Sequence, residues 1–423
     1  MAHRSMHDLL APSLSIDWPN MPIVRAEGTR VYGQDGRVYL DFVSGMAALP
    51  LGHGHPAVVA AIREQAGMLI HAPVGVYQYD VLLDLAEDLA DVMPGEIGMF
   101  FFGNSGAEAV EGAVKLARYV TGRQTVIAFR GGFHGRTLGA LALTASKAKY
   151  RHGYHPLPGA VHGRFPYPLR DRMTPQEATE RALGELDELL LHVVSPEDVA
   201  AFLVEPVQGE GGYVPATKEF LEGLRARADE AGALLIYDEV QTGFGRTGAM
   251  FAAQHYGVTP DVMALAKAIA SGLPLGAVAS TPEIMRKWTP ASHGTTFGGN
   301  PVAAAAARAT LRVLQEEDLP RRAADLGAGT TQALQALQAR HPEISEVRGP
   351  GLMIGVEFGE RRPEDGEFTR AVLRNCLDLG LVIYPCGTAG SALRFIPPLN
   401  VNESDLAQGI EILDRAIAKA RGR

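Results

Sequence analysis

The chain has 423 residues, 46% of them hydrophobic and 21% charged, and its 39 Lys and Arg against 48 Asp and Glu give a net charge of −9. This is the composition of a globular protein with a large core, long enough for two or three domains of about 100–200 residues each, and it excludes a disordered chain. The acidic balance and the absence of a Lys/Arg-rich run argue against a nucleic-acid-binding protein.

Several further classes of protein are disfavoured. Cys376 and Cys386 are the only cysteines, so the sequence predicts neither a disulfide framework nor a cysteine zinc cluster. The first thirty residues lack a secretory pattern, and the longest uncharged stretches, 42–62 and 289–307, are interrupted by Gly and Pro. We expect a cytoplasmic protein with no membrane partner and no metal. His3 and His7 are read as part of a loose terminus or of an arm that covers a dimer.

The N-terminal part predicts short elements. Residues 30–40 read as two strands joined by a turn at Asp35-Gly36. Residues 81–92 place Leu82, Leu85 and Leu89 on one face of a helix, because these positions are three and four apart.

From about residue 98 to 280, short apolar runs alternate with helical patterns. This alternation predicts a mostly parallel sheet with helices on both faces. The expected strands are 99–102, 125–129, 199–204, 233–237 and 262–266, with helices from about 107 to 117 and from 218 to 231.

The C-terminal part reads as helical over about 301–340 and then as mixed, with a closing helix near 404–420. Strands are expected near 352–358, 381–384 and 393–396. The sequence thus predicts an α/β protein with a large central domain (56–310) and a smaller α+β domain built from both termini (1–55 and 311–423).

Polar residues follow the predicted strands, at the edge where doubly wound sheets bind ligands. Gly103-Asn104-Ser105-Gly106-Ala107-Glu108 precedes a helix, so it is either a phosphate-binding helix start or an ordinary N-cap turn. Two neighbouring strands end in acids, Glu205 and Asp238, each followed by a glycine-rich turn. A helix cap or a surface carboxylate is the simpler interpretation, but the repetition favours function, since a buried acid needs a partner.

Lys267 stands alone in an apolar run at the end of another strand. It is either a lysine whose stem is buried and whose amine reaches water, or a desolvated amine nucleophile with a lowered pKa. Phe133 could stack on a planar ring and Arg136 could grip a carboxylate, although core and surface roles are the simpler readings. The uncharged loop 293–301 is a further candidate for a phosphate contact.

Together, an amine nucleophile, a strand-end carboxylate, a phosphate-binding helix start and an aromatic face are what pyridoxal phosphate requires. The motifs resemble, over nearly the whole chain, the class III aminotransferases of pyridoxal-phosphate fold type I, and most of all their 4-aminobutyrate aminotransferase branch. The resemblance implies a seven-stranded, mostly parallel sheet in the large domain. It is carried by the segments 104–109, 132–137, 205–212, 238–243 and 295–301, and by Lys267.

The resemblance also implies roles for individual residues. Lys267 would be the Schiff-base lysine and the base that moves the proton, and Asp238 would pair with the pyridine nitrogen. The remaining cofactor contacts would be Ser105, Gly106 and Ala107 at the phosphate, Gln241 at the ring hydroxyl, Val240 and Phe133 on the ring faces, His134, and Thr296 reaching the phosphate of a neighbouring subunit in an obligatory homodimer.

For the substrate, the resemblance implies that Arg394 binds the α-carboxylate of glutamate. Glu210 would pair with Arg394 when that carboxylate is absent, and Arg136 would grip the distal carboxylate. Met46 would lie at the pocket mouth, and we expect Tyr77 and Tyr79 to shape the pocket as well.

The implied reaction is a ping-pong transamination of an ω-amino acid with 2-oxoglutarate, two small-molecule substrates. Three alternatives stay open. An amino-acid racemase or epimerase has a very similar sequence but needs no second substrate. Acetylornithine and ornithine aminotransferases carry nearly the same motifs. A non-catalytic binding protein of the same fold would lack a reactive cofactor.

Overall fold

The computed structural model describes residues 9–14, 21–155, 157 and 159–422; His3 and His7 fall outside these ranges. Its centre is a seven-stranded sheet, as the family resemblance implies. Six strands are parallel and β12 alone is antiparallel to its neighbours. In spatial order the strands are β4 (Met99–Gly103), β12 (Gly276–Ser280), β11 (Val262–Leu265), β10 (Leu234–Asp238), β7 (Val199–Val204), β5 (Thr125–Phe129) and β6 (Ala160–Gly163).

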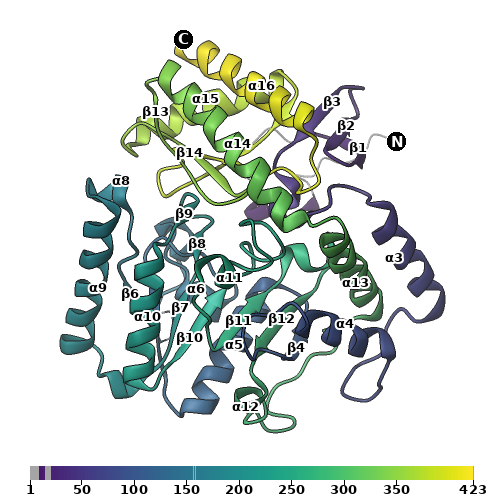
Figure 1. The fold of residues 1–423 in the computed structure, drawn as a ribbon, viewed down its shortest axis with the longest axis vertical. Helices are drawn as coiled ribbons and strands as arrows, with labels where there is room; N and C mark the ends of the chain where they lie inside the picture. The colour runs from purple at the N-terminus through teal and green to yellow at the C-terminus, as the bar shows by residue number, and fades with distance from the viewer. Residues whose placement is uncertain (1–8, 15–20, 156, 158, 423) are drawn as a thin grey trace.

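Helices cover both faces of this sheet (Figure 1). Because successive side chains of a strand point to opposite faces, Leu203 and Ile236 pack with α5 (Gly106–Thr121), whereas Phe202 and Leu235 pack on the other face, where α10 (Lys218–Ala231) lies. Every residue of β7 is buried, as expected of a strand with helices on both sides. Further helices around the sheet are α6 (Leu138–Leu143), α7 (Ala148–Arg151), α8 (Pro168–Asp171), α9 (Pro175–His192), α11 (Ala252–Tyr256) and α12 (Pro282–Met285).

A third group of helices flanks the β4 edge of the sheet. Helix α13 (Pro301–Glu316) packs against α3 (Pro56–Met68) and α4 (Asp80–Ala90). Arg308 of α13 forms ion pairs with Asp84 and Asp88 of α4. The helical region expected over 301–340 is in fact two helices, because the chain turns at Asp318, whose φ is +45°, before α14 (Leu319–Arg340).

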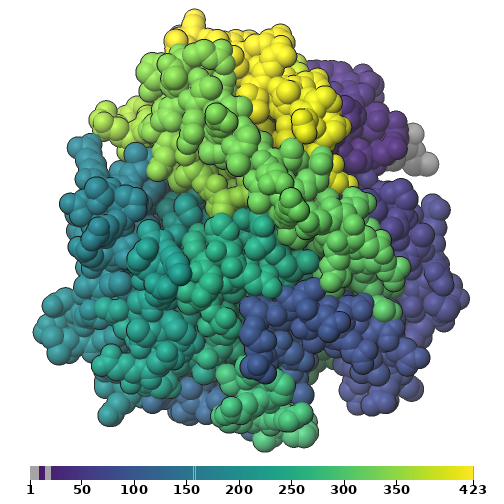
Figure 2. Space-filling view, in the orientation of Figure 1, coloured from purple at the N-terminus to yellow at the C-terminus, as the bar shows by residue number. Residues whose placement is uncertain are grey.

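The rest of the chain forms a smaller α+β part from both ends of the sequence. Figure 2 shows the C-terminal helix against the N-terminal strands. One sheet has the order β1 (Ile23–Glu27), β2 (Arg30–Gly33), β3 (Val38–Asp41), β15 (Leu381–Val382); the other has β13 (Ile344–Arg348), β14 (Ile354–Phe358), β17 (Ala392–Phe395), β16 (Tyr384–Cys386), with α15 (Pro363–Asp378) and α16 (Glu403–Arg421) beside them. The predicted hairpin at 30–40 is confirmed, and the strand expected at 381–384 is two short strands that belong to different sheets. The pairing of β3 with β15 supports a smaller part built from both termini. The domain boundaries at residues 55 and 310 stay a prediction, and position 310 lies inside α13.

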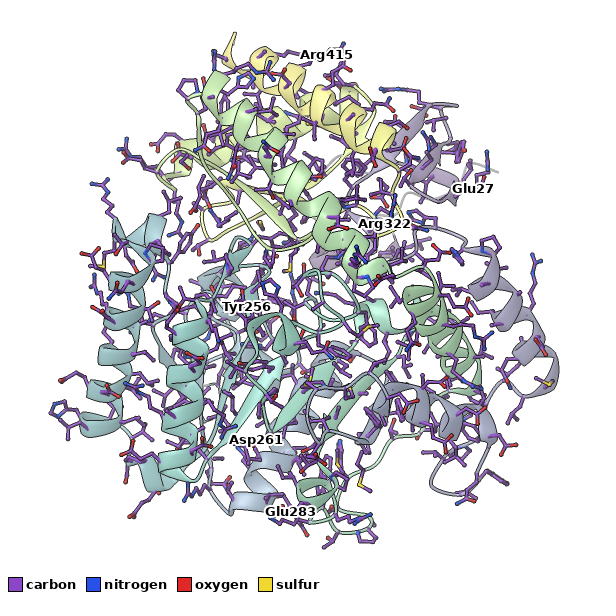
Figure 3. The ribbon with its side chains drawn as sticks, viewed as in Figure 1. Glu27, Tyr256, Asp261, Glu283, Arg322 and Arg415 are labelled. Carbon is purple, nitrogen blue, oxygen red and sulfur yellow. The ribbon has the colours of Figure 1, made fainter. Side chains whose placement is uncertain are left out.

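Single side chains hold neighbouring segments together (Figure 3). Arg322 of α14 donates to the carbonyl of Val401, 2.7 Å away, and so joins two segments of the C-terminal part. Asp261, just before β11, accepts hydrogen bonds from the backbone N–H of Leu235 and from Arg225, both at 2.7 Å. It thereby fixes the start of β10 against β11. No helix in the described ranges is long and apolar enough to cross a membrane.

A buried carboxylate ties the N-terminal strands to α16. Asp405 is 2% exposed and accepts hydrogen bonds from Thr29 at 2.5 Å and from Arg30 at 2.6 and 3.0 Å. We expect Asp405→Ala to cost about 1–3 kcal/mol, because it leaves the buried hydroxyl of Thr29 without its acceptor and removes the partner of the partly exposed Arg30. A lower thermal unfolding midpoint would show this. Glu403→Ala, an exposed acid in the same helical turn, is the matched control, and equal midpoints for the two variants would contradict the expectation.

Candidate active site

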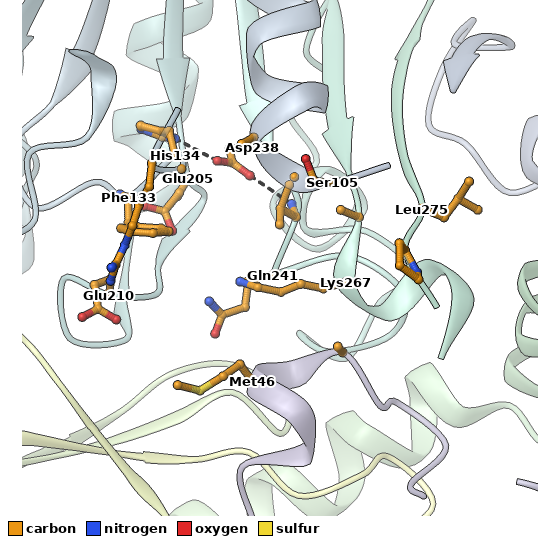
Figure 4. A pocket seen from close by; sticks show the side chains of 18 of the residues that line it. Met46, Ser105, Phe133, His134, Glu205, Glu210, Asp238, Gln241, Lys267 and Leu275 are labelled. Atoms are coloured by element: carbon orange, nitrogen blue, oxygen red, sulfur yellow. Dashed lines mark hydrogen bonds and ion pairs between the residues drawn. The ribbon is translucent and has the colours of Figure 1, made fainter. Parts of the chain in front are cut away.

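A cavity of about 470 Å³ opens at the carboxyl ends of the parallel strands and is bounded on the other side by α2 (Ser44–Ala47). Its volume is in the range of about 300–1,000 Å³ that small-molecule sites occupy. Figure 4 shows side chains from several loops that converge on it. The predicted site residues that line the cavity are Met46, Ser105, Gly106, Ala107, Phe133, His134, Arg136, Glu210, Asp238, Val240, Gln241, Lys267 and Arg394.

Three residues named in the sequence analysis do not line this cavity. Thr296 is exposed on the loop before α13. Tyr77 is 58% exposed, and the hydroxyl of Tyr79 donates to the carbonyl of Gly299 at 2.9 Å, outside the cavity. Tyr77 and Tyr79, which we expected to shape the pocket, therefore do not line it in the single chain.

Lys267 follows β11 in a strained backbone conformation. Its φ is +44°, a region that non-glycine residues rarely adopt, and it opens a short 3-10 helix over Lys267–Ala270. This turn directs the side chain into the cavity (Figure 4). Burial lowers the pKa of the Lys267 amine, although the carboxylates of Asp238 and Glu205 oppose the shift. A larger fraction of the amine is thus neutral and able to act as a nucleophile or base.

Asp238 is the last residue of β10 and is held in a single orientation. Its Oδ2 lies 2.8 Å from Nδ1 of the buried His134, and its Oδ1 accepts the backbone N–H of Val240 at 3.1 Å. Burial disfavours a charged His134, but the hydrogen bond and the charge of Asp238 outweigh it and raise the pKa of the imidazole. The pair places a fixed negative carboxylate at the deep end of the cavity, which can stabilise a positive charge on a ligand.

The start of α5 forms a cradle on the same cavity. Ser105 caps the helix, and its Oγ accepts the backbone N–H of Glu108 at 3.2 Å. A Cβ added to Gly106 would lie 2.9 Å from Cγ1 of Val240, so glycine is needed for this close approach. The first N–H groups of a helix have no partner within it and favour an anion such as phosphate. The predicted phosphate-binding helix start therefore fits the structure.

Two further side chains complete this half of the cavity. Gln241 has its Oε1 fixed by the hydroxyl of Tyr213 at 2.6 Å. A Cβ added to Gly209 would lie 2.4 Å from Nε2 of Gln241. This close approach explains why the turn that follows Glu205 has a glycine at this position. Phe133 and Val240 also line the cavity, and a planar ring held by the α5 cradle would have an apolar residue for each face.

The other half of the cavity, here called the charged half, contains a second group of charged residues, Glu210, Arg394 and Arg136. Glu210, on the loop between β8 (Val207–Gln208) and β9 (Val214–Pro215), forms an ion pair with the buried Arg394 of β17. Burial opposes ionisation of Glu210, but Arg394 and Lys147 outweigh it and lower its pKa to about 2. Arg136 is exposed, and its guanidinium lies 4.4 Å from the ring centre of Tyr150. The end of the cavity thus presents two arginines and one carboxylate.

Some residues of the site had no role assigned from the sequence. Glu205, recognised only as a strand-end acid, accepts the N–H groups of Phe133 at 2.7 Å and Gly209 at 3.0 Å, and burial raises its pKa to about 7. Lys147, Tyr150 and Tyr213 were missed. None of the three lies in a recognised motif or in a periodic pattern, so the sequence held no signal for them.

Comparison with known proteins places the chain in a family. The class-III aminotransferase family model matches residues 15–417. 4-Aminobutyrate aminotransferase GabT of Escherichia coli (strain K12) is 40% identical over 402 residues, covering 94% of this chain and 93% of that protein. Acetylornithine aminotransferase of Bacillus subtilis (strain 168) is 39% identical over 399 residues, covering 94% and 95%.

Solved structures agree with this placement. An amine transaminase from an uncultivated Pseudomonas species, in its PLP-bound form, superposes with a TM-score of 0.91 at 30% identity and covers 97% of this chain and 98% of that one. The chain therefore belongs to the class-III aminotransferases. The predicted family, the α/β fold and the pyridoxal-phosphate-dependent aminotransferase activity are confirmed.

Proposed function

We propose that this aminotransferase moves the amino group of an ω-amino acid, such as 4-aminobutyrate, to 2-oxoglutarate. The observation that carries the proposal is the Glu210–Arg394 ion pair in the same cavity as Arg136. One pocket has to accept a donor with a single carboxylate and an acceptor with two. An arginine that can be neutralised from within the chain meets both needs, because a buried charge left unpaired is costly.

Pyridoxal phosphate would supply a ring that accepts electrons from the substrate carbon. The start of α5 at Ser105, Gly106 and Ala107 would hold its phosphate, and Asp238, oriented by His134, would keep its ring nitrogen protonated. Gln241 would contact the ring hydroxyl, and the ring would lie between Val240 and Phe133.

The chain's own residues would then perform binding and proton transfer. The Nζ of Lys267 would take the proton from the substrate carbon that bears the amine, and its lowered pKa suits it to accept that proton near neutral pH. Arg136 would bind the distal carboxylate of either substrate. Arg394 would bind the α-carboxylate of 2-oxoglutarate, and Glu210 would neutralise Arg394 when the donor has none.

The active unit is proposed to be a cytoplasmic homodimer with Thr296 at the neighbouring subunit's cofactor phosphate. Three exposed features support an interface there. Thr296 and Phe297 are exposed on the loop before α13, and Phe297 is 60% exposed. Leu138, the first residue of α6, is 62% exposed. Sedimentation of the purified protein measures its mass, and a fully active monomer would contradict the dimer.

Acetylornithine transamination is the second candidate, favoured by the 39% identity to the Bacillus subtilis enzyme. A donor panel decides between the two. Purified protein with pyridoxal phosphate and 2-oxoglutarate is given 4-aminobutyrate, longer ω-amino acids or acetylornithine, and the glutamate formed is measured. Glutamate formed from acetylornithine alone would refute the ω-amino acid proposal. Loss of optical rotation from one amino acid without a keto acid would indicate the racemase.

The role of Glu210 gives a sharper prediction. In Glu210→Ala, Arg394 loses its charged partner, so a donor without an α-carboxylate would leave it unpaired. We expect kcat/KM for 4-aminobutyrate to fall about 10–100-fold, the range of one charge-assisted hydrogen bond, with little change for glutamate. Stopped-flow spectroscopy, which records the absorbance of the cofactor after the enzyme is mixed with one substrate, measures each half-reaction separately. An equal loss for both substrates would contradict the proposed pairing.

A further inference from the structure

The two oxygens of the Glu210 carboxylate have different partners. Oε2 contacts Arg394, whereas Oε1 lies 2.5 Å from Nζ of Lys147 and accepts the hydroxyl of Tyr150 at 2.8 Å. Lys147 and Glu210 have the same side-chain exposure, 14%, so the contact is largely removed from water. Glu210 is therefore shared between two cations, only one of which lines the cavity.

Lys147 occupies a defined place in the fold. It is the residue before α7, in extended backbone, and Tyr150 lies on the helix that follows. The ring of Tyr150 contacts three cations: the guanidinium of Arg136 lies 4.4 Å from its centre, and the amines of Lys147 and Lys149 lie 5.6 and 5.7 Å from it. Of these cations, Lys147 is the one that contacts Glu210, at the same oxygen that accepts the Tyr150 hydroxyl.

Sharing weakens the hold of Glu210 on Arg394. Guanidinium and carboxylate groups bind most strongly through two parallel hydrogen bonds, which need both carboxylate oxygens. Here one oxygen is engaged elsewhere, and Arg394 donates to Glu210 through a single nitrogen, while its Nε points to the carbonyl of Pro385 at 3.3 Å. An incoming carboxylate then competes with one hydrogen bond rather than two.

We infer that Lys147 is a positioning residue that competes with Arg394 for Glu210 and so makes Arg394 available to the α-carboxylate of the keto-acid substrate. The inference rests on the proposed function and deepens it. When Arg394 turns to the substrate, Glu210 keeps Lys147 and Tyr150 as partners and is not left as an unpaired buried charge. Without Lys147, both oxygens of Glu210 are free to turn to Arg394, and the dicarboxylate has to displace a stronger pair.

The test separates the two half-reactions. In Lys147→Met we expect kcat/KM for 2-oxoglutarate to fall about tenfold, mainly through KM, while the value for 4-aminobutyrate stays within about twofold. Lys218→Met, which removes a lysine that is 56% exposed at the start of α10, is the control for the loss of a lysine and should change neither value. Lys147→Arg should restore most of the loss. The inference is overturned if Lys147→Met leaves the ratio of kcat/KM for 2-oxoglutarate to kcat/KM for 4-aminobutyrate unchanged, whether both values stay the same or both fall equally.

A binding measurement tests the same point without turnover. Glutarate has two carboxylates and butanoate has one carboxylate. Neither carries an amino or keto group that could react. By calorimetry with the cofactor-loaded enzyme, Lys147→Met should weaken glutarate about tenfold and leave butanoate unchanged. In a Glu210→Gln background the substitution should no longer matter, and an effect that persists there overturns the inference. If wild-type enzyme makes no glutamate, the proposed function fails, and the glutarate comparison still decides the role of Lys147.

Discussion

Lys267→Ala is expected to lower kcat by about 1,000-fold or more, the largest loss from any single substitution in this chain. The upper part of the range for a positioned general base is about 10⁴-fold, and Lys267 is proposed to provide both the attachment point and the base. Its backbone strain and its lowered pKa fit a residue whose amine has to face the cavity in the neutral form. Steady-state glutamate formation measures the effect.

A second readout distinguishes loss of chemistry from loss of folding. Borohydride treatment should fix pyridoxal phosphate covalently to the wild-type chain but not to Lys267→Ala, and mass spectrometry detects the added mass. Lys287→Ala, at an exposed lysine of which 52% of the side chain is accessible, serves as the control for the loss of a lysine. Normal turnover in Lys267→Ala would refute the assignment.

Asp238→Asn is expected to have the second largest effect, about 10²–10³-fold in kcat, the range seen when a fixed charge-stabilising group is removed. The amide has nearly the same shape but carries no charge, so it cannot favour a protonated ring nitrogen. The pKa of His134 should fall as well, because the carboxylate of Asp238, the main group that opposes the effect of burial, is lost. Rates of each half-reaction, compared with the wild type, measure the loss.

His134→Gln separates position from charge at this site. It keeps the Asp238 carboxylate but removes the imidazole that lies 2.8 Å from it, so we expect a smaller loss than in Asp238→Asn. Pyridoxal phosphate titrated into both variants shows whether the cofactor still binds. If Asp238→Asn kept a normal kcat, or if His134→Gln were the more damaging change, the proposed role of Asp238 would be wrong.

Local sequence determined the large sheet and the residues at its edge. Five of its seven strands were predictable because each is a short apolar run, and parallel strands place their carboxyl ends along one edge. The edge strand β6 and the antiparallel β12 were not predicted from the sequence. Asp238, Glu205 and Lys267 directly follow such runs, so their proximity follows from the pattern once the strands pair. The start of α5 was predictable as part of the site because it directly follows the apolar run of β4.

Tertiary structure alone decided the charged half of the cavity. Lys147 and Glu210 are 63 residues apart and Glu210 and Arg394 are 184 apart, and the three meet only because α7, the β8–β9 loop and β17 converge. The sequence pointed to Arg394 and Glu210 through family resemblance and did not point to Lys147. Contacts between side chains on separate loops leave no periodic pattern, since they depend on how the loops pack and not on the backbone repeat of one element.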